Sequence, residues 1–271
     1  MNASIAVPSG GDLFEGHFPG RPILPGVAQL AMILDASGSQ IHISSGLRAI
    51  AHMRMRQLVL PGDQLELTTR ELDGGRLRFD LKRTGVVVAN GELVFRLLDA
   101  TESVPTPKSF PIHKAGPARM FAPPLDALIP HRPPMRFLTE LLDETQEGLI
   151  CEAHVPAACA LVREDGVRAL VALEAAAQSA AAWEALQRRR QGGTVGPRVG
   201  YLVALRDVAL FADRICADEP LICSVQQESV ALPLSYYRVA VSSKDKPILG
   251  GTIVTFLTDS EGAEKSAGVG G

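Results

Sequence analysis

One histidine of the sequence stands in a segment whose composition suits acid–base chemistry. His17 lies within residues 14–27 (FEGHFPGRPILPGV), where three prolines and three glycines impose a rigid, irregular loop. An imidazole held on such a loop can act as a general base near pH 7. The loop leads into a helix expected to begin after Pro25, and unpaired N–H groups at a helix start can stabilise a developing oxyanion. On these residues alone, a solvated loop histidine beside a stiff turn is the competing interpretation.

The helices and strands expected around this loop follow the same order in both halves of the sequence. In each half, strand-like and loop residues precede one helix, and a series of strands follows it. The expected helices cover 26–38 and 168–190. The expected strands cover 4–7, 47–60, 64–72, 76–84, 86–98, parts of 136–156, 199–213, 220–231, 234–243 and 248–258. The sequence therefore predicts an N-terminal unit (1–100), a Pro/Ser/Thr-rich linker (101–120), a C-terminal unit (121–259) and a disordered tail (260–271).

Both expected helices are apolar nearly all round, and the second is rich in alanine. A helix without a polar face has to be enclosed, and a curved antiparallel sheet wrapped around it would do so. The sequence therefore predicts an α+β fold in which two such units pair their sheets edge to edge.

Composition excludes several classes of function. Hydrophobic residues make up 46% and charged residues 21%, and the formal net charge is -3. This balance lacks the basic surface of a nucleic-acid-binding protein. No secretory signal is recognisable, and the longest apolar stretch, residues 169–182, is interrupted by Glu174 and Gln178. We therefore expect a cytoplasmic protein without nucleic-acid or membrane partners.

The cysteines do not indicate a metal or redox site. None forms a CxxC pair or has histidines at metal-ligand spacing, and all four lie in the second half: Cys151, Cys159, Cys216 and Cys223. We expect free thiols in a reducing compartment.

Four segments together resemble the β-hydroxyacyl-acyl carrier protein dehydratases, which adopt the hotdog fold. The loop GHFPGRPILPGV (16–27) is similar to the signature loop of that family. Residues 60–65 (LPGDQL), 129–135 (IPHRPPM) and 173–178 (LEAAAQ) resemble three further family segments. The resemblance touches both halves and implies a double hotdog that forms an intramolecular pseudo-dimer.

The sequence departs from the family pattern in a complementary way. In the family, a carboxylate follows the loop histidine by fourteen positions, and the working site pairs the histidine of one subunit with the carboxylate of the other. Here Ala31 stands fourteen positions after His17, whereas Glu174 matches the family carboxylate in the second half. Ala160 stands where the second half would need its histidine. The resemblance therefore implies one intact site, formed by His17 and Glu174 across the two halves, and one inactive site.

The family mechanism implies a role for each matched residue. His17 would remove the proton α to a thioester carbonyl, and the Gly26 N–H would stabilise the charge on that carbonyl oxygen. Glu174 would donate a proton to the departing β-hydroxyl, with a pKa raised by apolar surroundings. Gln178, one helical turn later, would orient Glu174. No cofactor and no metal are implied.

The resemblance also marks Phe18 and Val27 as substrate-positioning residues and Arg21 as a contact for the phosphate of the carrier protein. Three further residues have weaker assignments. Asp35 is an alternative acid, His131 is expected to have a packing role, and His154 is a poor substitute for the missing loop histidine because no proline–glycine framework surrounds it.

The resemblance implies a 3-hydroxyacyl-acyl carrier protein dehydratase. The segments LPGVAQL (24–30) and PHRPPM (130–135) also resemble the dehydratase components of aryl polyene biosynthesis, so aryl polyene or fatty acid biosynthesis is the expected setting. The expected partner is an acyl carrier protein bearing an acyl-phosphopantetheine substrate, and homo-oligomers of the pseudo-dimer are possible. A hotdog thioesterase and a non-catalytic acyl-binding subunit are the alternatives.

Overall fold

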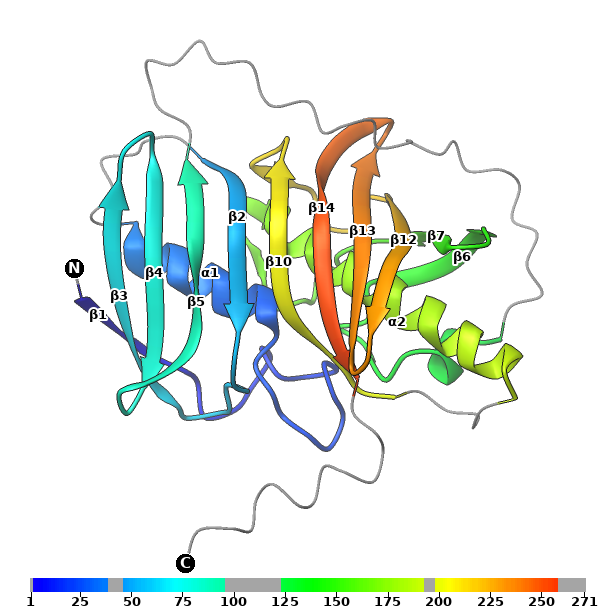
Figure 1. Ribbon diagram of the computed structural model, residues 1–271, viewed down its shortest axis with the longest axis horizontal. Coiled ribbons are helices and arrows are strands. Elements are labelled where there is room, and N and C mark those ends of the chain that lie inside the picture. The colour runs from blue at the N-terminus through cyan, green and yellow to red at the C-terminus, as the bar shows by residue number, and fades with distance from the viewer. Residues whose placement is uncertain (1, 39–45, 96–122, 193–197, 258–271) are drawn as a thin grey trace, which may run out of the picture.

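The structure is a computed structural model that describes residues 2–38, 46–95, 123–192 and 198–257. The expected linker (101–120) and tail (260–271) lie outside these ranges. An 11-stranded sheet forms the frame of the molecule, in the order β1-β3-β4-β5-β2-β10-β14-β13-β12-β7-β6 (Figure 1). Every pairing in this sheet is antiparallel.

The first half of the chain supplies one helix and the first five strands. Helix α1 spans Gly26–Ser37. The strands are β1 (Asn2–Ala6), β2 (Leu47–Met55), β3 (Gln64–Leu72), β4 (Arg76–Arg83) and β5 (Val86–Phe95).

The second half supplies a longer helix, α2 (Ala172–Arg190), preceded by the short 3-10 turns η1 (Leu125–Ala127) and η2 (Ala169–Val171). Its strands in the large sheet are β6 (Leu138–Glu144), β7 (Gly148–Ala153), β10 (Gly200–Leu210), β12 (Leu221–Ala231), β13 (Leu234–Ser243) and β14 (Lys246–Leu257). A small sheet that the sequence analysis missed contains β8 (Val162–Arg163), β9 (Gly166–Arg168) and β11 (Arg214–Ile215).

Most expected elements agree with the structure to within a few residues, and the exceptions have local causes. The expected strand 47–60 ends at Met55 because the following segment packs on the histidine-bearing loop, where the Leu24 N–H donates to the Val59 carbonyl at 2.9 Å. The expected helix 168–190 begins at Ala172, because its first residues complete β9 and η2.

The two helices lie against one face of the sheet, as Figure 1 shows, and each begins near the middle of the molecule and runs outward. None of the α2 residues before Arg190 is exposed, which confirms that the helix is enclosed. The halves join where β2 pairs with β10, with Met53 opposite Leu205. None of the described helices is long and apolar enough to span a membrane.

Candidate active site

The loop that carries His17 is fixed against the segment that carries His131. Gly16 has φ +74, a left-handed conformation that favours glycine, and a Cβ there would lie 2.1 Å from the Arg132 carbonyl oxygen. In return, the Arg132 N–H donates to the Gly16 carbonyl at 2.7 Å. The His17 Nδ1 lies 2.9 Å from the Ile23 carbonyl oxygen. Because a carbonyl can only accept, Nδ1 carries the hydrogen and Nε2 keeps its lone pair. The backbone thus determines which ring nitrogen is available.

Glu174 lies in the first turn of α2 and is held by Gln178, as the one-turn spacing predicted. The Gln178 Nε2 donates to Glu174 Oε1 at 3.0 Å and to the Met135 carbonyl at 2.7 Å. The Gln178 Oε1 accepts from the Phe137 N–H at 2.8 Å. Gln178 is completely buried, so this bonding anchors the carboxylate to the backbone before β6.

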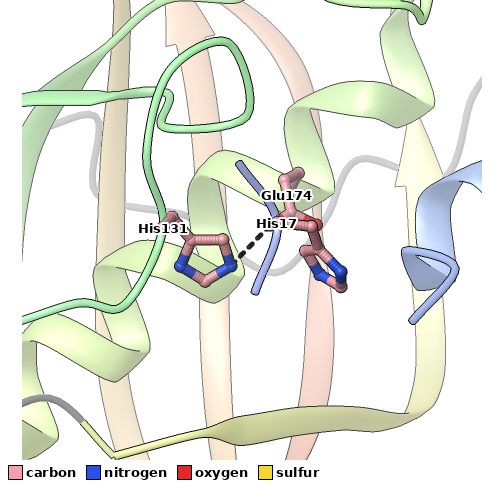
Figure 2. Close-up of side chains that lie close together, drawn as sticks. All are labelled: His17, His131 and Glu174. Atoms are coloured by element: carbon pink, nitrogen blue, oxygen red, sulfur yellow. Dashed lines mark ion pairs between the residues drawn. The ribbon is translucent and has the colours of Figure 1, made fainter. Parts of the chain in front are cut away.

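Three side chains meet at the start of α2. Figure 2 shows His17, His131 and Glu174 gathered there. The His131 Nε2 lies 3.3 Å from Glu174 Oε1, and one ligand atom from each residue lies within 4.8 Å of the others. All three residues are buried. The packing role expected for His131 is therefore incomplete, because this buried residue also contacts the carboxylate of Glu174. The proline-rich stretch 129–135 was the available signal, but its contact with Glu174 depends on a fold that sequence spacing does not reveal.

The electrostatics of the cluster correct a second expectation. Burial lowers the pKa of His17 to about 4, helped by the nearby His131 and opposed by Glu174. Burial alone would raise the pKa of Glu174, as the sequence suggested. The hydrogen bond from His131, the charges of the two histidines when protonated and the Gln178 amide instead lower it to about 2. Near neutral pH the cluster therefore holds a neutral His17 and an ionised Glu174.

A cavity of about 370 Å³ connects the cluster with the start of α1 and one face of α2. His17, Glu174 and Gly26 all line it. A Cβ on Gly26 would lie 2.8 Å from the Met55 sulfur, so glycine leaves room for that side chain. Phe18 also lines the cavity, and its ring centroid lies 4.0 Å from that of His17.

The cavity continues along α2 at helical spacing. Beyond Glu174 its lining includes Ala177 and Ala181, then Glu184 and Arg188. The alanines leave space between the helix and the ends of β10 and β14. The outer end of the cavity is instead lined by ionisable side chains. Burial raises the pKa of Glu184 to about 7, against the opposing charges of Arg188 and Arg198. The cavity therefore has an apolar middle and a polar outer end.

Several sequence candidates lie outside this cavity. Among the described residues, Val27 is in the hydrophobic core and Arg21 is exposed on the loop, and neither lines the cavity. Asp35 pairs with Arg163 at 2.5 Å and with Arg168, so it is not placed to act as a replacement acid. The His154 Nε2 lies 3.9 Å from the Asp218 Oδ1, and His154 does not line the cavity either.

Comparisons with known proteins identify the family of the chain. Residues 123–265 match the ApeP-like family, described as ApeP dehydratase, and residues 1–92 match the ApeI-like family, described as ApeI dehydratase. A 3-hydroxyacyl-[acyl-carrier-protein] dehydratase FabZ from Protochlamydia amoebophila is 33% identical over 99 residues. That alignment covers 33% of this chain and 64% of the relative, so the chain spans less than two thirds of the relative's length.

Solved structures of low identity share the fold. A structure of dehydratases from type I polyketide synthases matches with a TM-score of 0.70 at 15% identity, covering 95% of this chain and 93% of that chain. The dehydratase domain of the polyketide PpsC from Mycobacterium tuberculosis matches with a TM-score of 0.69 at 14% identity, covering 96% and 93%. The fold is a double hotdog. By its family matches the chain belongs to the hotdog dehydratases, with an ApeI-like first half and an ApeP-like second half.

Proposed function

We propose that this protein removes water from a 3-hydroxyacyl thioester to give a trans-2-enoyl thioester. The observation that best supports this is the shared cavity in which His17 from the first half and Glu174 from the second lie beside the start of α1. A neutral imidazole, a carboxylate and a helix-start N–H are the groups that such an elimination requires.

In the proposed reaction, His17 accepts the proton from C2, and the Gly26 N–H stabilises the charge on the thioester oxygen. The electron pair left at C2 forms the double bond as the C3–O bond breaks. The proton passes from the His17 imidazolium to Glu174 and then to the departing hydroxyl, which leaves as water. The route starts from the resting cluster, in which His17 is neutral and Glu174 is ionised. Both residues end in their starting states.

We propose an acyl carrier protein as the bearer of the substrate, because the FabZ relative is named for that carrier. The exposed Arg21 on the loop is the proposed contact for the phosphopantetheine phosphate, and Phe18 the residue that positions the acyl group. Fatty acid or aryl polyene biosynthesis is the proposed setting. We also propose that the two hotdog units span residues 1–100 and 121–259.

The test uses the full-length chain and a 3-hydroxyacyl thioester of an acyl carrier protein. We expect enoyl absorbance to appear without release of free thiol. His17→Ala and Glu174→Gln should each lower turnover by about a hundredfold or more. Asp73→Asn is the control, since Asp73 lies on the exposed turn between β3 and β4 and outside the cavity, and should keep the parent activity. Thiol release without an enoyl product would instead indicate a thioesterase, and no turnover of any thioester would indicate an acyl-binding subunit.

A further inference from the structure

We propose that His17, His131 and Glu174 also form a binding site for a divalent transition-metal ion of the Zn²⁺ type, and that the bound ion blocks the substrate. One ligand atom of each residue lies within 4.8 Å of the others, and all three side chains line or approach one cavity (Figure 2). The inhibition rests on the proposed function, whereas the binding does not.

The donor set selects the class of ion. Two imidazole nitrogens and one carboxylate oxygen suit Zn²⁺, which commonly binds three protein ligands and leaves a fourth position open. Mg²⁺ and Ca²⁺ prefer oxygen ligands. In a tetrahedral Zn²⁺ site, neighbouring donor atoms lie about 3.3 Å apart. The His131 Nε2 and Glu174 Oε1 are already 3.3 Å apart. The other donor–donor distances are at most 4.8 Å, which exceeds the tetrahedral spacing by no more than about 1.5 Å.

Contacts outside the cluster hold two of the three proposed ligands in place. The Ile23 carbonyl fixes the hydrogen of His17 on Nδ1, and Gln178 holds the carboxylate. Such outer contacts orient metal ligands in known sites.

His131 needs one change of tautomer, and its surroundings permit it. Its Nε2 faces Glu174, so binding a metal there moves the ring hydrogen to Nδ1. The His131 Nδ1 is buried and has no hydrogen-bond partner in the described structure. Moving the hydrogen to Nδ1 therefore breaks no existing hydrogen bond at that atom.

Occupation of the site would stop the elimination for two reasons. The ion would take the His17 lone pair that accepts the C2 proton, and it would hold the Glu174 carboxylate that returns this proton to the hydroxyl. Its open position would face the cavity of about 370 Å³ that the thioester must enter. Zn²⁺ and substrate should therefore compete.

The binding test requires no activity. Full-length protein, freed of metal with a chelator, is titrated with Co²⁺ and followed by visible absorption, then with Zn²⁺ by calorimetry. Cys216→Ser is the background for all variants, because this exposed cysteine is a competing ligand. We expect one Zn²⁺ per chain and the absorption of tetrahedral Co²⁺. His131→Ala should weaken Zn²⁺ binding by at least about tenfold, whereas His52→Ala, at an exposed strand position, should not.

In the kinetic arm, Zn²⁺ should inhibit the Cys216→Ser protein competitively with the thioester, EDTA should reverse the inhibition, and Mg²⁺ should have no effect. Absence of Co²⁺ absorption and Zn²⁺ heat, or Zn²⁺ binding that survives both His131→Ala and Glu174→Gln, would overturn the site. Zn²⁺ binding by a protein that dehydrates no thioester would support the site and contradict the proposed function instead.

Discussion

At the scale of single residues, His17 and Glu174 are governed by opposite balances of burial and contact. Both side chains are buried, which disfavours the charged form of each. For His17 burial dominates, and the ring is neutral at neutral pH. For Glu174 the contacts with His131 and Gln178 outweigh burial, and the carboxylate is ionised. Burial therefore keeps His17 neutral, whereas hydrogen bonds and nearby charges keep Glu174 ionised against the effect of burial.

The lowered pKa of His17 predicts a specific loss of stability in mild acid. The pKa falls from 6.5 for the unperturbed residue to about 4 in the folded protein. The unfolded chain therefore binds the proton first as the pH falls below about 6.5, and the free energy of unfolding decreases until about pH 4. Between pH 7 and 5 this should cost about 2 kcal/mol, which His17→Gln should remove. Urea unfolding at both pH values measures the difference.

The exposed His52 on β2 provides the control for that experiment. His52→Gln should leave the pH dependence of stability as it is in the parent. An equal loss of stability between pH 7 and 5 in the parent and in His17→Gln would contradict the assignment.

The contact between His131 and Glu174 predicts a kinetic effect. His131→Leu leaves the buried carboxylate without one of its hydrogen bonds, so the pKa of Glu174 should rise and kcat/KM should fall by about ten- to a hundredfold. His131→Gln keeps an amide donor and should retain more activity. The pH profiles of kcat/KM for the parent and both variants check this. Parent-like profiles in both variants would return His131 to the packing role.

At the scale of elements, the start of α1 and one face of α2 shape the cavity. Gly26 is the first residue of α1, after Pro25 with ψ 142, and it lacks the side chain that would meet Met55. On α2, the small side chains of Ala177 and Ala181 leave the space beyond Glu174. The conformations of the loop and of the two helices therefore decide where a ligand can lie in the cavity.

The role of the Gly26 N–H can be separated from its steric role. Gly26→Ala with Met55→Ala removes the clash and keeps the N–H, so it should retain most activity. Gly26→Pro with Met55→Ala replaces the N–H by the ring carbon Cδ, and proline is accepted as the first residue of a helix. This variant should lose about a hundred- to a thousandfold in kcat at nearly unchanged thermal stability. Equal kcat values in the two double variants would exclude the oxyanion role.

At the scale of the whole molecule, the α1 positions that match Glu174 and Gln178 make a contact between the two halves. At the position of α1 that matches Glu174, the Ala31 carbonyl accepts from Arg168 at 3.1 Å. Asp35, which matches Gln178, pairs with Arg163 and Arg168 from the other half. The α1 positions that match Glu174 and Gln178 are therefore engaged in a hydrogen bond and ion pairs that connect the two halves.

Because both site residues come from one chain, variants should not complement each other. An equimolar mixture of His17→Ala and Glu174→Gln chains, refolded together, should show no more dehydration than the separate variants. A site shared between two chains would instead recover activity in the mixture. Enoyl formation by the mixture, compared with the parent refolded in the same way, measures this.

The sequence by itself determined the features that depend on local spacing. The proline–glycine loop, the two enclosed helices, most strands of the sheet and the division of His17 and Glu174 between the halves all follow from short-range patterns and from the resemblance carried by residues 16–27. These features could be predicted because turn residues, apolar periodicity and the one-turn spacing of Glu174 and Gln178 depend only on residues close together along the chain.

The tertiary structure alone decided which distant groups become neighbours. It brought His131 to Glu174 and so reversed the expected direction of the Glu174 pKa. It buried Val27 in the core and placed Asp35 among arginines of the other half. Such outcomes depend on burial and on charges brought together across long stretches of chain, and these quantities are defined only once the sheet has closed around both helices.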